Sequence, residues 1–170
     1  SGHEGHKPVA KKIVLTEAGN DAFGTIQEII TKLSQDPTTD WSKVNLEAVR
    51  KHLLDMYDMT MSVTVVSQKP VSGGMEAVVY PTTDRAAKAL VRVFNAHPAQ
   101  LKKESGWDMT IKKGFGKKYN KYIVTVTTSK DSEVDKIRGF GYIGVMAAGK
   151  HHQTHHLMMA KGENAHKHEH

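Results

Sequence analysis

The chain has 170 residues, with 24 lysines and arginines against 18 aspartates and glutamates, giving a formal net charge of +6. Hydrophobic residues make up 38% of it, enough for a core, and no apolar run reaches the roughly 18 residues of a membrane-spanning helix. The lack of cysteine excludes disulfides, thiolate metal ligands and a thiol nucleophile. Its 11 histidines and 8 methionines, beside only 4 phenylalanines and 2 tryptophans, point to metal chemistry.

The first part of the chain predicts a flexible arm followed by a helix. Residues 1–15 are polar and glycine-containing and have no hydrophobic period, so we expect an arm that carries histidines. Over residues 16–34 apolar side chains recur at three- and four-residue spacing, which predicts an amphipathic helix. The Asp36-Pro37 pair ends this helix, because a residue before proline is pushed out of the helical region.

A second helix is predicted directly afterwards. Asn45 has the side chain of an N-cap, and residues 46–59 keep a helical period. The apolar side chains expected on its inner face are Leu46, Val49, Leu53 and Tyr57. Together the two helices predict a helical hairpin over residues 16–61.

Beyond residue 61 the hydrophobic period changes to two. The expected elements are strands at 62–66 and 75–80, a helix at 85–96 that His97-Pro98 ends or kinks, strands at 107–115 and 121–128, and a helix at 131–159. This order predicts an α+β fold, in which the N-terminal helical hairpin precedes a ββαββα two-layer sandwich with a mostly antiparallel sheet and a long His-rich C-terminal helix. We expect one domain over residues 16–162, with the sandwich at 62–162, and a His-rich tail at 163–170.

Four histidines near the C-terminus form the first candidate metal site. His151 and His155, and likewise His152 and His156, are four residues apart, a spacing that lets two imidazoles on a helix hold one ion. Met159 continues the same stripe. No glutamate adjoins the first histidine, so the zincin motif is not met. The alternative interpretation is a polar or pH-responsive helix end, whose histidines change charge between about pH 5 and 8.

A second stripe lies on the second predicted helix. His52, Met56 and Met59 follow one another at four- and three-residue spacing. Methionine is commonly core filler, but imidazole and thioether together are soft neutral donors that favour copper, especially Cu(I). Asp55 and Asp58 are positioned to orient a ligating histidine. Haem is disfavoured, because there is no attachment motif and aromatic residues are few.

The N-terminus offers a third nitrogen-rich set. If Ser1 is the mature end, Ser1, Gly2 and His3 provide an amine, two amides and an imidazole that suit square-planar Cu(II) or Ni(II). A cloning remnant would also begin Ser-Gly. A start that resembles a processed end, together with the missing cysteines, suggests a periplasmic or secreted protein.

The glycine pattern Gly139, Gly141 and Gly144 has the letters of a dinucleotide-binding fingerprint. That motif requires a strand before it, whereas the preceding residues predict a helix. The glycines are therefore expected to let the last helix pack closely against its neighbours.

A lysine-rich segment offers a possible anion site. Between residues 102 and 121 seven lysines face two acidic residues, so this segment contributes +5 of the net +6. The candidate contacts are Lys112, Lys113, Lys117 and Lys118. A phosphate backbone or an anionic surface would suit them, but a solvated strand edge is the simpler interpretation, and nucleic-acid binding is disfavoured.

These patterns favour a copper-binding protein for extracytoplasmic copper storage, transfer or tolerance, with its centre between the second and last helices. Zinc and nickel are the alternative metals. One rival is a redox or hydrolytic metalloenzyme that uses the same histidines with an open coordination position; another is an anion or nucleic-acid binding module based on the lysine hairpin. The sequence favours a binding role over catalysis, a metal-handling protein as partner and no membrane insertion, and it leaves a homodimer open.

Overall fold

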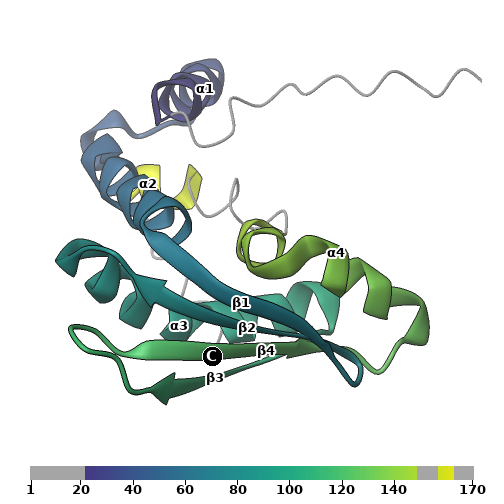
Figure 1. Ribbon diagram of the computed structural model, residues 1–170. Helices are drawn as coiled ribbons and strands as arrows, with labels where there is room; N and C mark the ends of the chain where they lie inside the picture. Colours follow the sequence, from purple (N-terminus) through teal and green to yellow (C-terminus); the bar gives the residue numbers. More distant parts are fainter. Residues whose placement is uncertain (1–21, 149–156, 163–170) are drawn as a thin grey trace, which may run out of the picture.

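The computed structural model describes residues 22–148 and 157–162, and a four-stranded antiparallel sheet organises it (Figure 1). The strands lie in the order β1-β2-β4-β3 and are β1 (Val63–Val71), β2 (Gly74–Pro81), β3 (Asp108–Gly114) and β4 (Lys121–Thr127). In the central strands β2 and β4, alternate side chains are buried, as the period of two predicts. The α+β class and the antiparallel sheet are thereby confirmed.

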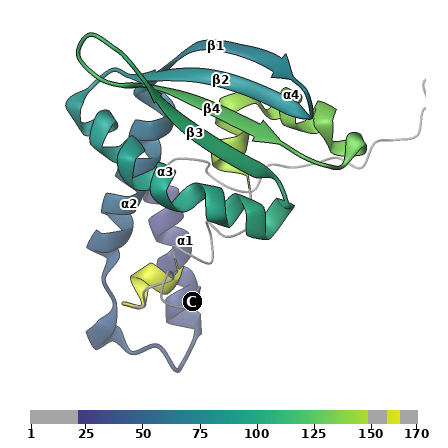
Figure 2. The same ribbon diagram turned by 90° about the horizontal axis from the view of Figure 1, so that it is seen from below.

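Two helices pack against the same face of this sheet, as Figure 2 shows: α3 (Asp84–Ser105) and α4 (Asp131–Ala147). Buried side chains from both helices join those of the strands in one main core. Among the described residues this core contains Met59, Met75, Ala77, Val79, Leu90, Phe94, Leu101, Trp107, Met109, Tyr122, Val124, Val126, Ile137, Tyr142, Val145 and Met146.

Helix α3 does not end at the His97-Pro98 pair, which corrects the first of the two outcomes that the sequence predicted, an end or a kink. It continues to residue 105 and ends at Gly106, whose φ of 77° is left-handed. Leu101, beyond the proline, is buried in the main core, and His97 Nε2 lies 3.0 Å from the carbonyl oxygen of Val145. Burial of the last turns thus outweighs the roughly 3 kcal/mol that an internal proline costs.

The expected continuous helix over residues 131–159 is also wrong. Helix α4 kinks at Gly141, where φ is 60°, and it ends at Ala147, because Ala148 has extended backbone angles. At the kink Tyr142 N donates to Gln68 Oε1 at 2.6 Å, and a Cβ at position 141 would lie only 2.7 Å from that oxygen. Gly141 therefore permits a close approach to β1. The glycine pattern lies inside a helix, as expected, and does not follow a strand.

The predicted helical hairpin is present over the described residues, as α1 (Ala22–Gln35) and α2 (Leu46–Met61), with a short 3₁₀ helix η2 (Trp41–Lys43) between them. Asn45 caps α2 as expected, since its Oδ1 accepts from Ala48 N at 3.1 Å. The hairpin extends away from the sheet, with α2 leading into β1 (Figures 1 and 2). From here on, the arm means α1, η2 and α2 together, and not the flexible stretch expected at residues 1–15.

The inner face of α2 differs from the predicted one at its C-terminal end. Tyr57 is 46% exposed, whereas the neighbouring Asp58 and Met59 are buried. The physical reason is that α2 packs on α3 as well as on α1, and near its end Arg85 of α3 binds Asp58. Two partners at different angles bury a wider part of the helix than a single apolar stripe indicates.

Candidate functional site

One stripe of α2 carries the histidine and methionine that the sequence singled out. Val49, His52 and Met56 follow the cap residue Asn45 at spacings of four, three and four residues, so all lie on one side of the helix. Val49 is fully buried, while His52 and Met56 are half-buried. Met56 packs against a second hydrophobic cluster that lies within the arm.

The second cluster is completed from the other end of the chain. Residues 157–162, which we call the terminal segment, lie beside α2 in both views of the molecule (Figures 1 and 2). Asn45 N donates to the carbonyl oxygen of Ala160 at 2.7 Å, and Ala160 is fully buried. Leu157 and Met159 pack against the same cluster as Met56.

A glycine fixes the end of this docking contact. Gly162 has a φ of 79°, and a Cβ there would lie 2.7 Å from the carbonyl oxygen of Lys43. A larger residue would therefore push the terminal segment away from the start of α2. The contact joins parts of the chain more than 100 residues apart, and no local sequence pattern predicts it.

Met59 does not belong with Met56. It is 2% exposed and lies in the main core between α2 and the sheet, where its carbonyl oxygen accepts from Tyr142 Oη at 2.6 Å. The expectation that His52, Met56 and Met59 form one ligand stripe is therefore corrected at Met59. Met59 follows Met56 by three residues, so the two side chains point about 60° apart around the helix axis, enough to change the packing partner.

Asp55 and Asp58 are held by arginines of α3. Arg85 binds Asp58 with Nε–Oδ2 and Nη2–Oδ1 distances of 2.7 and 3.0 Å, and Arg92 binds Asp55 at 2.9 and 2.6 Å. The hydrogen bonds that these carboxylates accept raise the pKa of both guanidinium groups. The two carboxylates thus join α2 to α3, and the metal hypothesis does not require them.

The remaining predicted metal ligands lie outside the described residues: Ser1, Gly2, His3, His151, His152, His155 and His156. Within the described ranges 22–148 and 157–162, no group of three histidine, aspartate or glutamate side chains is arranged to hold a metal ion.

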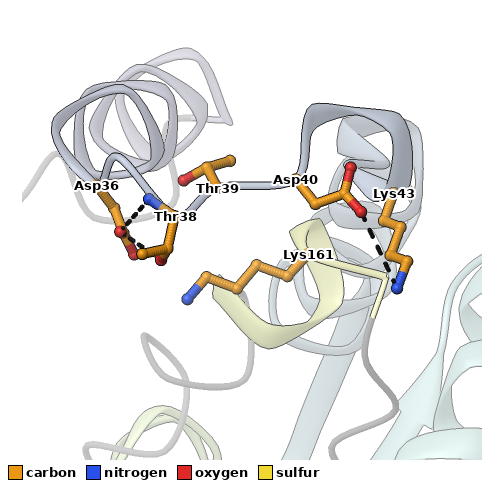
Figure 3. Close-up of a pocket in the computed structure, with 6 residues that line it drawn as sticks. All are labelled: Asp36, Thr38, Thr39, Asp40, Lys43 and Lys161. Atoms are coloured by element: carbon orange, nitrogen blue, oxygen red, sulfur yellow. Dashed lines mark hydrogen bonds and ion pairs between the residues drawn. The ribbon is translucent and has the colours of Figure 1, made fainter.

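The loop between α1 and α2 forms a hollow of about 260 Å³ that sequence analysis did not single out (Figure 3). Asp36 Oδ1 accepts from the amide and hydroxyl of Thr38, and Asp40 caps η2 through Ser42 in the same way. These hydrogen bonds lower the pKa of both carboxyls. Lys161 extends from the terminal segment toward the loop, so the hollow is the rim of the docking contact.

A second hollow, of about 360 Å³, lies at the end of α3 against α4. Trp107 Nε1 donates to Glu133 Oε2 at 2.5 Å, and the Lys136 ammonium lies 5.9 Å from the centre of the Trp107 ring. The tryptophan ring also meets Phe140 edge-on, with ring centres 5.5 Å apart. These groups satisfy one another, which indicates a packing role.

The candidate anion-binding lysines all lie at the β3–β4 hairpin. Lys112 and Lys113 are on β3, whereas Lys117 and Lys118 are in the loop, and all four side chains are exposed. None of them forms an ion pair with a described residue.

None of the helices in the described part is long and apolar enough to cross a bilayer. Comparison with known proteins adds no relative: no protein-family model, no curated protein and no solved structure matches this chain.

Proposed function

We propose that this protein binds copper through imidazole and thioether groups gathered at the arm, and that it serves in storing, transferring or tolerating copper outside the cytoplasm. The single observation that carries the proposal is the docking of the terminal segment on α2. Leu157 and Met159 share a hydrophobic cluster with Met56. In the sequence, the double histidines directly precede Leu157.

Covalent geometry limits how far the histidines can be from that stripe. His156 is bonded to Leu157, and His155 is one residue further, so each is separated from a docked residue by no more than about 3.6 Å per residue. On α2, His52 lies one turn before Met56 on the same side. The centre that we propose is made of His52, Met56 and two of His152, His155 and His156, with Met159 or His151 as further donors.

The chemistry of this donor set favours copper. Imidazole and thioether are neutral and soft, and thioether in particular selects Cu(I) over zinc, magnesium and calcium. A neutral ligand set leaves the charge of a divalent ion uncompensated in a half-buried place, which again favours the monovalent ion. The N-terminal set of Ser1, Gly2 and His3 remains a separate proposal for Cu(II) or nickel.

The test is a titration of the full chain with Cu(I) against a coloured competing chelator. Met56→Leu keeps the apolar volume but removes the sulfur, and its matched control is Met61→Leu, because Met61 is 63% exposed and outside the arm cluster. We expect Met56→Leu to weaken binding at least about tenfold, the loss that even a supporting partner of a metal ligand causes. The control should bind like the original protein.

A second variant tests convergence of the two segments. His52→Ala combined with His155→Ala should abolish stoichiometric copper in protein purified without affinity resin. A variant with His166, His168 and His170 changed to glutamine provides the control for adventitious binding by the tail. If the double variant keeps its copper and the tail variant loses it, the arm centre is refuted.

A further inference from the structure

The hairpin between β3 and β4 concentrates positive charge without local neutralisation. From Met109 to Lys130 the sequence contains no aspartate or glutamate but six lysines: Lys112, Lys113, Lys117, Lys118, Lys121 and Lys130. The first five lie on the hairpin, and none of these five forms an ion pair with any residue in the described ranges. Such a cluster attracts an anionic partner.

The tip of this hairpin has a defined conformation. The hydroxyl of Tyr80 accepts from the amides of Lys118 and Tyr119 at 3.2 and 3.0 Å, and the hydroxyl of Tyr119 donates to Asp84. A Cβ at Gly116 would lie 2.0 Å from the carbonyl oxygen of Tyr119, so the turn requires glycine there. These contacts from β2 and α3 hold the loop in place.

The same loop holds an apolar side chain out in solvent. Phe115 lies between Gly114 and Gly116 and is 91% exposed, the highest value among the large hydrophobic side chains of the described residues. The loop extends away from the end of the sheet in Figure 2. Transfer of such an exposed phenylalanine side chain from water into an apolar phase lowers the free energy.

The lysines surround the tip and do not line one face. Lys112 pairs with Ile123 and Lys113 with Tyr122, so by strand alternation Lys112 projects from the open side of the sheet and Lys113 from the helix side. Lys117 and Lys118 lie in the loop itself. This distribution fits a flat anionic surface that meets the hairpin end-on, whereas a nucleic-acid strand needs its phosphate contacts along one groove.

We propose that this hairpin docks the protein on an anionic lipid bilayer, with Phe115 at the boundary of headgroups and acyl chains and the lysines against lipid phosphates. Each lysine near an anionic membrane contributes about fivefold in affinity, and the phenylalanine adds apolar burial. Lysine also suits a surface of single phosphate charges better than base readout, for which the forked side chain of arginine is preferred. The contact is peripheral and independent of the copper proposal.

The experiment is sedimentation of the metal-free full chain with vesicles of phosphatidylcholine alone or mixed equally with phosphatidylglycerol, in the presence of a chelator. Lys112→Gln, Lys117→Gln and Lys118→Gln combined should lower partitioning to the mixed vesicles about a hundredfold. The matched charge control is Lys51→Gln, Lys88→Gln and Lys103→Gln, at exposed positions on the helices. Its partitioning should change by much less.

The phenylalanine is tested in the same way. Phe115→Ala should lower partitioning about tenfold or more, whereas Phe23→Ala, at an 81% exposed position of the arm, should leave it unchanged. Circular dichroism shows that each variant is folded. No binding to mixed vesicles at low salt overturns the proposal, and so does equal binding by the hairpin and control variants. Lysine-dependent binding to a single-stranded oligonucleotide without vesicle binding overturns it in favour of a nucleic-acid partner.

Discussion

The main core and the arm cluster are built in different ways. The main core takes its buried side chains chiefly from β2, β3, β4, α3 and α4, with Met59 of α2, and its central strands β2 and β4 are buried along one whole face. The arm cluster has only five buried members among the described residues: Ile29, Leu33, Val49, Leu53 and Ala160. One of these five comes from the terminal segment, at the far end of the sequence.

Because of this difference, we expect the main core and the arm to differ in the free energy that their local opening costs. The main core buries enough apolar surface to hold its elements by itself, whereas two helices alone form a marginal cluster that depends on a third partner. The arm is therefore the part whose local opening costs least, and the proposed copper centre lies in that part. A bound ion that bridges α2 and the terminal segment would stabilise the arm selectively.

The largest expected effect is in the main core. Leu90→Ala removes a fully buried side chain of α3 and should lower the free energy of unfolding by about 3–4 kcal/mol. Urea unfolding followed by the fluorescence of Trp107, which is buried in the same core, measures the loss. A change below about 1 kcal/mol would mean that this core adapts by collapse of the cavity.

The corresponding change in the arm should be smaller and local. Leu33→Ala leaves a cavity between α1 and α2, and we expect a loss of about 2 kcal/mol, because an exterior cluster relaxes more readily. Native-state hydrogen exchange should show faster exchange of α1 and α2 amides with β2 and β4 unchanged. Equal acceleration in the sheet would show that arm and core unfold as one unit.

The two arginine–aspartate pairs join α2 of the arm to α3, and they should contribute differently to the stability of the fold. The carboxylate of Asp58 is inaccessible to solvent, whereas that of Asp55 is 25% exposed, and both arginine partners are more than half exposed. Asp58→Ala should lower the melting temperature by about 5 °C, and Asp55→Ala by clearly less, since solvent screens the exposed pair. Thermal unfolding of both variants decides between them, with Glu47→Ala as the control, because both side chains of the Glu47–Arg50 pair are more than half exposed.

The smallest effect concerns the hydrogen bond from Tyr142 on α4 to the backbone of Met59 on α2. Tyr142→Phe should cost about 1 kcal/mol at neutral pH. Burial raises the pKa of the Tyr142 phenol, so the folded state retains the proton longer than the unfolded chain does. The stability due to this group is therefore complete below the ordinary phenol pKa of 10.0 and is lost as the pH rises above it.

The measurement is a series of urea titrations of both proteins from neutral to alkaline pH. The stability difference between the original protein and Tyr142→Phe should shrink as the pH rises past about 10. Because the two proteins differ only at position 142, the difference isolates that side chain. A difference that grows with pH contradicts the assigned direction.

Several parts of this structure could be predicted from local pattern. The Asn45 cap, the helical period of α1 and α2 and the alternation in β2 and β4 depend on contacts within a few residues or on one buried face. The prediction failed where a distant partner decided the outcome. Helix α3 passes Pro98 because Leu101 is buried beyond it, and α4 bends at Gly141 because Gln68 of β1 approaches its backbone.

The candidate site likewise has features that the sequence predicts and features that only the tertiary structure decides. The residue types and spacing of His52 and Met56 are visible in the sequence, and their donor chemistry follows from composition alone. Only the folded chain separates Met56 from Met59, assigns Asp55 and Asp58 to arginines and brings Ala160 to Asn45. A local sequence fixes which face of a helix is apolar, but the choice of what covers that face is made by long-range packing, which no local period encodes.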